Sequence, residues 1–350
     1  MNKAFDTDSP ELKQDIPRLD PLEPKSPVAT LPASYLEQYL EPFRDLIECA
    51  DIVELAINPD GQVWIERQGA STMEQTGQNI AGPAAANLAA TLVGDARAKM
   101  SEKSPLVSGK IEYRDRPLRI QVVVPPAVER GAAISIRLFG MGEQTTYEPE
   151  YLFGEPVSLD DKRQSKLAEI QDLAKTNLSG ALEILVQNRL NLLISGGTST
   201  GKTTFARHLL KSVHDNERLI TIEDAFELFP NQPNSVCLLA ERTPNTTRSA
   251  NALLQAGLRM RPDRIVVGEL RGPEALTYLE AINTGHGGSV TTIHAETAGR
   301  AVDRLALMVL QAGTPLTFGE VQTYIRKSID IIVQLGRVEG RRGIAEVLVV

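Results

Sequence analysis

The sequence predicts an α/β protein in which a mostly parallel sheet (residues 181–350) follows a smaller α+β domain (31–140). Beyond residue 181, short apolar runs alternate with helical patterns, which is typical of parallel strands covered by helices. Before residue 140, strand-like segments and a hairpin signal dominate instead. The chain has 350 residues, enough for two domains with cores of their own.

The first residues predict little regular structure. Residues 1–30 place prolines among Asp, Glu and Lys, so we expect a disordered or extended arm that buries too little apolar surface to offset its ordering entropy. From Ser34 onward, Leu36 and Leu40 stand in helical register. Pro42 ends or kinks this helix and can begin a second short one.

A hairpin and further strands complete the first domain. The runs 53–57 and 62–67 flank the turn sequence NPDG, in which each residue favours a turn. After an alanine-rich helix come the strand-like segments LVSGKIEYR, LRIQVVVPP and AAISIRLF. Residues 141–180 are interpreted as a linker with a polar helix, long enough that an exchange of domains between subunits stays open.

Alternating strands and helices define the second domain. Strands are predicted at 190–195, 218–223, 264–268 and 289–293, and helices at 202–213, 249–260, 273–283, 298–312 and 318–328. The chain then closes with a hairpin around residues 339–343 that would extend the sheet. Ligands of such sheets bind at the carboxyl ends of the strands, so the functional residues are expected there.

The first of these strands, LNLLIS, runs into GGTSTGKTT, which fits the phosphate-loop pattern G-x-x-x-x-G-K-[ST]. A helix with Phe205, Leu209 and Val213 on one face follows. Glycines let backbone N–H groups cradle phosphate oxygens at the helix N-terminus, so this context favours a nucleoside triphosphate site over a flexible loop that matches by chance. The residues expected to bind the nucleotide are Gly196, Gly197, Thr198, Ser199, Thr200, Gly201, Lys202, Thr203 and Thr204.

Acidic residues at other strand ends predict how the triphosphate is broken. Lys202 would reach the β and γ phosphates, and the Thr203 hydroxyl would bind Mg²⁺. Glu223 and Asp224 end one predicted strand and can position Mg²⁺ or an attacking water, with a solvated acidic loop as the alternative. Glu269 follows the buried strand RIVVG and either orients Mg²⁺-bound water or acts as a base; a strand-end carboxylate without function is the alternative.

Histidines and arginines are further candidates. His294 follows the predicted strand 289–293, so it would share the edge of the phosphate loop, where a neutral imidazole can hydrogen-bond the γ-phosphate network. For His294 and for His286, a structural role is the alternative. Arg119 and Arg137 stand in apolar strands of the first domain, where they face a phosphate, a partner or solvent.

Composition restricts the setting. The net charge of −8 argues against nucleic acid as a direct partner, because phosphate backbones favour basic surfaces. Cys49 and Cys237 are too isolated to build a disulfide framework or a zinc site. The N-terminus lacks the apolar region of a signal peptide, and no apolar stretch approaches the ~20 residues that span a bilayer. We therefore expect a cytoplasmic protein that can dock peripherally at the inner membrane.

Together, these segments of residues 35–350 resemble the ATPases of type II and type IV (conjugal-transfer) secretion systems. LRMRPDRIVVGELRGPEAL and NTGHGGSVTTIHAE look most like the conjugation branch (TrbB-like and VirB-operon), and the chain lacks the tetracysteine metal module usual in type II relatives. The resemblance implies a RecA-like second domain, a PAS-like first domain, ATP and Mg²⁺ as ligands, and a homohexameric ring. It implies an aspartate box at Glu223 and Asp224, a histidine box at His286 and His294, catalytic roles for Lys202, Glu223, Glu269 and His294, metal binding by Thr203, Glu223 and Glu269, and nucleotide contacts from Arg119 and Arg137.

The function implied by this resemblance is ATP hydrolysis that powers substrate export or pilus assembly together with membrane-associated secretion or conjugation proteins. Glu269 and Glu223 would align water for in-line attack, while Lys202 and the two arginines offset the developing charge. Closure of one domain on the other would be the work stroke. The alternatives are a nucleic-acid translocase, which the acidic composition disfavours, and an ATP-regulated scaffold that does not hydrolyse.

Overall fold

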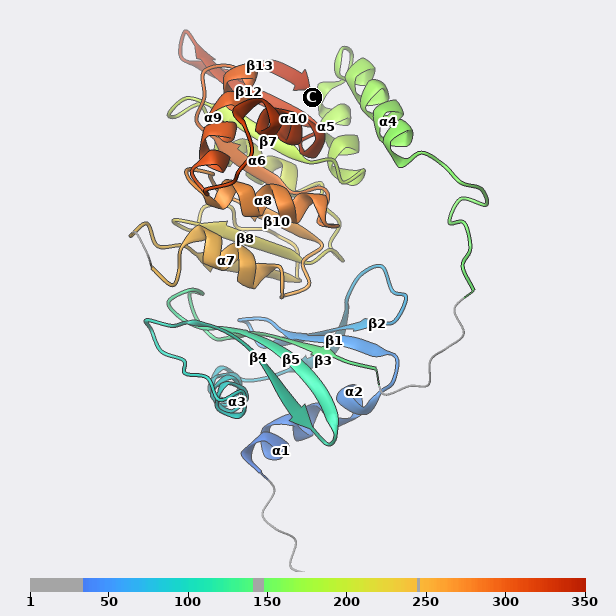
Figure 1. Cartoon of the computed structure of the whole chain (residues 1–350), viewed down its shortest axis with the longest axis vertical. Coiled ribbons are helices and arrows are strands. Elements are labelled where there is room, and N and C mark those ends of the chain that lie inside the picture. Colours follow the sequence, from blue (N-terminus) through green and yellow to red (C-terminus); the bar gives the residue numbers. More distant parts are fainter. Residues whose placement is uncertain (1–33, 141–147, 244–245) are drawn as a thin grey trace, which may run out of the picture. The chain divides into compact units, whose positions relative to one another are not determined.

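Two β-sheets organise the chain in the computed structural model, which describes residues 34–140, 148–243 and 246–350 (Figure 1). The first sheet has six strands in the order β3-β2-β1-β6-β5-β4, and the second has seven in the order β13-β12-β7-β11-β10-β8-β9. The predicted arm at 1–30 and the beginning of the predicted linker lie outside the described residues. The predicted domain boundaries therefore stay a prediction.

The first sheet is antiparallel throughout, as its hairpins require. Its elements are α1 (Tyr35–Leu40), the 3-10 helix η1 (Glu41–Phe43), α2 (Arg44–Glu48), β1 (Ile52–Ile57), β2 (Gln62–Arg67), β3 (Glu74–Asn79), α3 (Gly82–Asp95), β4 (Leu106–Tyr113), β5 (Arg116–Val123) and β6 (Ala133–Leu138). Gly61 has the positive φ of +90° that the hairpin between β1 and β2 needs. The sequence prediction missed β3, because its residues EQTGQN are polar and mostly exposed at the sheet edge.

The predicted polar helix of the linker is α4 (Leu159–Ala174), and a second helix, α5 (Leu178–Gln187), which was not predicted, follows it. The first helix, α4, is mostly polar, whereas α5 buries Ala181, Leu185 and Val186. The Asn177 side chain accepts a hydrogen bond from the backbone N–H of Gly180 at 3.0 Å, so it begins the second helix as an N-cap. This cap separates α5 from the polar helix α4.

The second sheet has parallel strands except at the last one. Its strands are β7 (Leu192–Gly196), β8 (Leu219–Glu223), β9 (Ser235–Leu239), β10 (Arg264–Val267), β11 (Val290–Ile293), β12 (Ile331–Val338) and β13 (Arg341–Val349), with helices α6 (Lys202–Leu210), α7 (Ala250–Gly257), α8 (Glu274–Asn283), α9 (Ala298–Leu310) and α10 (Phe318–Ser328). The predicted terminal hairpin extends the sheet, because β12 pairs with β7. The prediction missed β9, a five-residue strand at the sheet edge.

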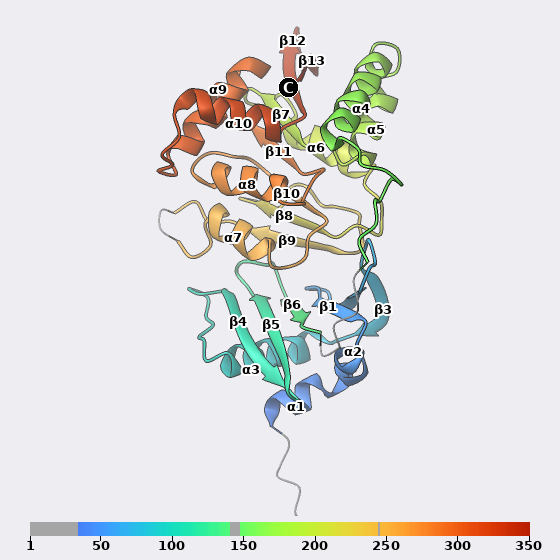
Figure 2. The same cartoon turned by 45° about the vertical axis from the view of Figure 1, so that its right-hand side comes forward.

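Helices cover both faces of this sheet (Figure 2). Leu192 and Ile194 of β7 belong to a core with α4, α5 and α6, whereas Leu193 belongs to a core with α7 to α10. Neighbouring residues of one strand point to opposite faces, so a continuous apolar run serves two cores. The sheet is therefore buried on both faces, and its strand ends are the places left for polar chemistry.

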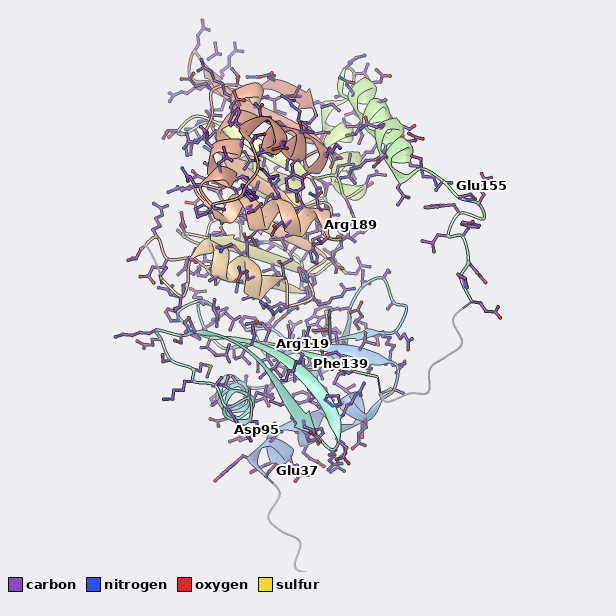
Figure 3. All side chains as sticks on the ribbon, viewed as in Figure 1. Glu37, Asp95, Arg119, Phe139, Glu155 and Arg189 are labelled. Atoms are coloured by element: carbon purple, nitrogen blue, oxygen red, sulfur yellow. The ribbon has the colours of Figure 1, made fainter. Side chains whose placement is uncertain are left out.

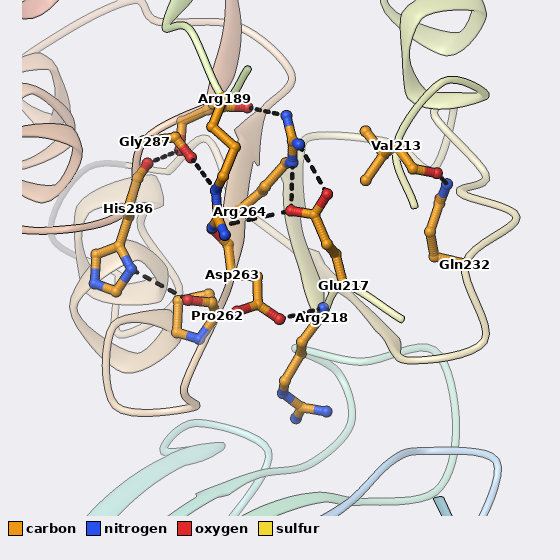
Figure 4. A network of polar contacts seen from close by, with 12 residues as sticks. Arg189, Val213, Glu217, Arg218, Gln232, Pro262, Asp263, Arg264, His286 and Gly287 are labelled. Carbon is orange, nitrogen blue, oxygen red and sulfur yellow. Dashed lines mark hydrogen bonds and ion pairs between the residues drawn. The ribbon is translucent and has the colours of Figure 1, made fainter. Parts of the chain in front are cut away.

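A buried ion pair fixes the amino ends of these strands (Figure 4). The Arg264 guanidinium donates to both carboxylate oxygens of Glu217, at 2.8 Å each. Arg264 is 1% exposed and Glu217 is 5% exposed. Although burial by itself raises the pKa of Glu217, the hydrogen bonds and charges of Arg264 and Arg189 bring it below its ordinary value.

Arg218 links this edge to the first sheet within the compact unit Tyr35–Val350. Its guanidinium donates to Asn58 Oδ1 at 2.7 Å and to the Met260 carbonyl at 2.8 Å. Burial lowers the pKa of Arg218 to about 10, so the side chain stays charged at neutral pH. An ion pair between Arg261 and Glu66 of β2, at 2.7 Å, is a further link to the first sheet.

We expect Glu217→Gln to lower the free energy of unfolding at pH 7 by about 3–5 kcal/mol, because it leaves the Arg264 charge buried and uncompensated. The pKa of Glu217 is lower in the folded state than in the unfolded state. Its contribution to stability is therefore fully present above about pH 4.5 and is lost as the pH falls through the folded-state pKa. Urea unfolding at several pH values measures both effects. A gap between wild type and variant that stays constant down to acid pH would contradict this assignment.

Candidate active site

The phosphate-loop sequence forms the connection from β7 to α6, as predicted. A Cβ on Gly196 would lie 2.5 Å from Thr200 Oγ1 and 3.0 Å from the Leu335 carbonyl, so a side chain there would force these atoms to move. Gly201 has φ of +94°, the left-handed conformation that glycine adopts without strain. The loop therefore turns tightly between a buried strand and a helix N-terminus, the arrangement that binds phosphate.

Lys202 is held across the mouth of this loop. Its Nζ donates to the carbonyls of Gly196 at 3.0 Å and Gly197 at 3.1 Å, and it lies 3.3 Å from Nδ1 of His294. Burial lowers the pKa of Lys202, and the nearby Glu269 carboxylate opposes this shift. The loop, the cation and the histidine thus form one contacting group.

A cavity of about 490 Å³ opens in front of the loop. This volume lies in the range of small-molecule sites. It is lined by Thr198–Thr204, Glu223, Asp224, Ala225, Glu227, Arg242, Gly268, Glu269, Arg271, Thr292, His294 and Arg342. The structure therefore gathers the predicted loop, acidic residues and His294 around one space.

Glu269 follows β10 and faces the loop from the next strand but one. Its Oε2 accepts a hydrogen bond from Arg271 at 2.8 Å, and its Oε1 lies 3.4 Å from Nε2 of His294. The pKa of His294 lies below its ordinary value, mainly because of burial, although the Glu269 carboxylate opposes this shift. The Glu269 side chain is 16% exposed. Its carboxylate therefore faces the cavity while Arg271 contacts one oxygen and His294 the other.

Glu223 is engaged with its own segment. Its Oε1 accepts from Thr221 Oγ1 at 3.0 Å, and its Oε2 accepts from the backbone N–H groups of Glu227 and Leu228 at 2.8 and 2.9 Å. Burial raises the pKa of this carboxyl, and these hydrogen bonds lower it. The Oε2 atom thus holds the chain that follows β8, while Oε1 is bonded within the strand, a structural role that the sequence prediction did not include.

Asp224, the next residue, is more open to the cavity. It accepts from Arg242 Nε at 2.8 Å and lies 3.8 Å from Nη1 of Arg271. Arg271 therefore bridges the carboxylates of Asp224 and Glu269.

The two predicted histidines lie at opposite ends of β11. His294 follows the strand and lines the cavity, but His286 precedes it, and its Nδ1 lies 3.2 Å from the Pro262 carbonyl (Figure 4). The four residues of β11 separate them, so the structure does not bring His286 to the phosphate loop. The pKa of His286 lies below its ordinary value, mainly because the side chain is buried.

The two predicted arginines of the first sheet are not among the residues that line the cavity. Arg119 and Arg137 are opposite each other on β5 and β6. Arg137 pairs with Glu54 at 3.0 Å, and Arg119 lies over the Phe139 ring at 5.6 Å (Figure 3). Their contact with a nucleotide stays a prediction.

Sequence reasoning missed the three arginines that do line the cavity. Arg271 stands two residues after Glu269 in GELRG, a signal that the sequence offered. Arg342 belongs to β13 of the terminal hairpin. It reaches the cavity only because β12, the other strand of that hairpin, pairs with β7. Arg242 follows the unpredicted strand β9, so no sequence pattern indicated it.

A phosphate loop after β7, with β11 between it and the acidic end of β10, defines a P-loop NTPase of the RecA-like type. The family model described as "Type II/IV secretion system protein" matches residues 149–349. The chain therefore belongs to this family.

Individual relatives agree with this assignment. The type IV secretion system protein VirB11 of Bartonella quintana is 34% identical, over 88% of this chain and 91% of the relative. The conjugal transfer protein TrbB of Rhizobium radiobacter is 32% identical, over 86% of this chain and 84% of the relative. The crystal structure of the VirB11 ATPase from the Brucella suis type IV secretion system, in complex with sulphate, matches with a TM-score of 0.75 and 29% identity, over 90% of this chain and 94% of that chain.

These comparisons confirm the family resemblance, the fold class and the ATP hydrolase class predicted from the motifs. Nucleotide binding follows from membership of the family. Across the described parts of the chain, no helix combines the length and the apolar character that crossing a bilayer requires.

Gly196→Ala should destabilise the folded chain by about 1–3 kcal/mol, because the added methyl group forces Thr200 and the Leu335 backbone to move. Gly197→Ala is the matched control, since its Cβ would meet only Thr200 Cγ2 at 3.9 Å. This control should leave stability unchanged or slightly raised. Denaturant unfolding of both variants without nucleotide measures the difference, and equal stabilities would disprove the close approach at Gly196.

Proposed function

We propose that this chain forms a homohexameric ATPase that hydrolyses ATP to power substrate export or pilus assembly in a type IV secretion or conjugation system. The observation that carries the proposal is a single cavity shared by the phosphate loop, Lys202 and Glu269. The similarity to a VirB11 protein and to a TrbB protein supports the cellular role.

The cavity suits a ligand with several negative charges. Backbone N–H groups of a helix N-terminus and the Lys202 ammonium face it, and Arg242, Arg271 and Arg342 line it as well. The Brucella suis relative was crystallised in complex with sulphate, another tetrahedral oxyanion. These features support ATP as the substrate, with its phosphates on the loop.

The residues around the cavity also fit Mg²⁺. In the described residues no group of three or more His, Cys, Asp or Glu side chains could hold a metal by itself. This suits Mg²⁺, which is commonly bound by one or two carboxylates together with substrate phosphates. We propose Thr203 and Glu269 as its protein ligands, together with Glu223, whose Oε1 accepts only one hydrogen bond from the described residues and so keeps a lone pair for the metal. When bound, Mg²⁺ would shield the phosphate charge.

Hydrolysis then follows from the positions of the side chains. Glu269 would align a water and accept its proton as the water oxygen attacks the γ-phosphorus and the bond to the β–γ bridging oxygen breaks. Lys202 and Arg271 would offset the negative charge that develops on the phosphate oxygens. His294, which contacts both Lys202 and Glu269, would hold the two at a fixed separation.

The assembly and setting are proposed from the family. In a ring, Arg119 and Arg137 would reach the nucleotide only if the first sheet of the same or a neighbouring copy came to the loop. Closure of that sheet on bound nucleotide would couple hydrolysis to movement. We propose a cytoplasmic ring that docks peripherally on membrane-associated secretion proteins at the inner membrane, without direct contact to nucleic acid.

Glu269→Gln is expected to lower kcat by about 10²–10⁴-fold and to leave ATP affinity within a few-fold of wild type, because an amide cannot accept the proton. Steady-state phosphate release and binding of a fluorescent ATP analogue measure the two effects. Retained turnover would remove Glu269 from its role. A wild-type ring that binds ATP but releases no phosphate would favour the scaffold, and stimulation by DNA at physiological salt the translocase.

Arg271→Ala should lower kcat by about 10- to 100-fold, the range for residues that orient a catalytic group, because Glu269 loses its nearest partner. KM should change much less, and Arg271→Lys should restore part of the rate. Arg259→Ala, an exposed arginine outside the cavity, is the control. An increase in KM with unchanged kcat would show that Arg271 binds substrate without positioning Glu269.

A further inference from the structure

The terminal hairpin contacts the chain just after His294. Gln334 of β12 donates a hydrogen bond from its Nε2 to the Ala295 carbonyl at 3.1 Å. Glu346 of β13 accepts a hydrogen bond at its Oε2 from the backbone N–H of Ala298, the first residue of α9, at 3.0 Å. Side chains from both strands of the hairpin therefore hold the short connection between His294 and α9.

A β-bulge brings these two side chains to one face of the hairpin. Gln334 pairs with Glu346, whereas the next residue, Leu335, pairs with Ile344, so β13 carries one extra residue at this point. Opposite residues of an antiparallel pair share a face, and neighbours on one strand point to opposite faces. Glu346 therefore points to α9 together with Gln334, while Ile344 packs with Leu335 in the core that includes α6. Without the extra residue, Glu346 and Ile344 would point to the same face.

The Gln334 amide also contacts the strand that supports the phosphate loop. Its Nε2 donates to the Leu335 carbonyl at 3.3 Å, and this is the carbonyl that a Cβ on Gly196 would approach to 3.0 Å. Gln334 itself pairs with Ser195, the residue before Gly196. One amide group thus joins the backbone beside the phosphate loop to the backbone beside His294.

Gln334 lies behind the reacting groups. It is 5% exposed, and the described residues that line the cavity include neither it nor Glu346. His294 does line the cavity, 3.3 Å from Lys202 Nζ and 3.4 Å from Glu269 Oε1. A displacement of about 1 Å breaks contacts of this length, so the backbone that carries His294 has to be held in place.

We propose that Gln334, assisted by Glu346, is a positioning residue for ATP hydrolysis and fixes His294 relative to the phosphate loop. The proposal rests on the proposed function, because it takes Lys202 and Glu269 to act on the bound triphosphate. Gln334 touches no substrate and acts through His294, which keeps the ammonium and the carboxylate at their working separation. The two hairpin residues thus influence the rate of the chemical step and not the affinity for ATP.

Gln334→Met removes the amide and keeps a flexible side chain of similar length that suits a buried position. We expect kcat to fall by about 10- to 100-fold, the range for residues that hold a catalytic group in place. ATP affinity, measured with a fluorescent analogue, should stay within about 3-fold of wild type, because the loop and the cavity lining are unchanged. An unchanged kcat, with or without a rise in KM, would overturn the proposal.

Gln232→Met is the matched control. Gln232 is 3% exposed, and its Nε2 donates to the carbonyls of Leu210 and Val213, at the end of α6, at 2.8 and 3.0 Å (Figure 4). It is the same buried amide bonded to two carbonyls, but it is not among the described residues that line the cavity. This variant should lose about as much stability as Gln334→Met and keep kcat within about 2-fold of wild type. Equal losses of kcat in the two variants would show a general effect of destabilisation and contradict a positioning role.

A double-mutant cycle tests whether Gln334 acts through His294. Its four members are the wild type, Gln334→Met, His294→Ala and the double variant, and kcat is measured for each. Without the imidazole Gln334 has nothing to position, so adding Gln334→Met to His294→Ala should lower kcat by less than about 2-fold further. Losses that multiply would mean that the two residues act independently, and the proposal would then be wrong.

Glu346→Gln separates the hydrogen bond from the charge. An amide oxygen still accepts from the Ala298 N–H, so kcat should stay within about 3-fold of wild type, whereas Glu346→Met, which has no such acceptor, should lower it further. Equal losses in the two variants would remove Glu346 from the proposed role.

Hydrogen exchange provides a readout that does not depend on catalysis. In the full chain without nucleotide, peptides that cover residues 294–300 should exchange faster in Gln334→Met than in wild type, because the connection to α9 loses a hydrogen bond to the hairpin. The same peptides should exchange at the wild-type rate in Gln232→Met. Wild-type exchange in Gln334→Met would exclude the proposed support of His294. The proposed function fails separately, if the wild-type chain neither binds nor hydrolyses ATP.

Discussion

The close approach of β7 to β12 at Gly196 is the constraint on which the site depends. A Cβ on Gly196 would crowd Thr200 Oγ1 and the Leu335 carbonyl, so glycine lets the strands approach closely at this turn. The same turn presents the carbonyls of Gly196 and Gly197 to Lys202 Nζ, which holds the cation at the mouth of the loop. Parallel pairing of β7 with β11, and of β11 with β10, then places His294 and Glu269 around it.

Charges around the cavity are mostly in contacting pairs of opposite sign. Arg242 contacts Asp224, and Arg271 contacts both Asp224 and Glu269. A triphosphate would compete with these carboxylates for the same cations, because guanidinium groups bind phosphate as readily as carboxylate. Substrate entry would therefore change the surroundings of Glu269 before any bond is broken. Arg342, which has no such partner among the described residues, differs from the other two arginines in this respect.

The two ends of the parallel sheet serve different purposes. At the amino ends, Arg264 and Glu217 are buried and satisfy each other's hydrogen bonds, and His286 contacts a backbone carbonyl. Groups that are buried and already paired stabilise the fold but offer little to a ligand. At the carboxyl ends, Lys202, Glu269 and His294 are only partly buried and share a cavity. The difference in burial separates the structural cluster from the reactive one.

Local patterns were enough to predict the phosphate loop, most of the order of strands and helices, and the positions of Glu269 and His294 at strand ends, because these depend on short motifs and on the direction of parallel strands. The sequence prediction missed two edge strands: β3, whose residues EQTGQN are polar, and β9, whose run SVCLL is apolar but only five residues long. Tertiary structure alone decided that Glu223 holds its own loop, that His286 lies at the far edge, and that Arg242, Arg271 and Arg342 surround the cavity. The terminal hairpin and the phosphate loop lie far apart in the sequence and come together through the pairing of β12 with β7, which no local pattern specifies.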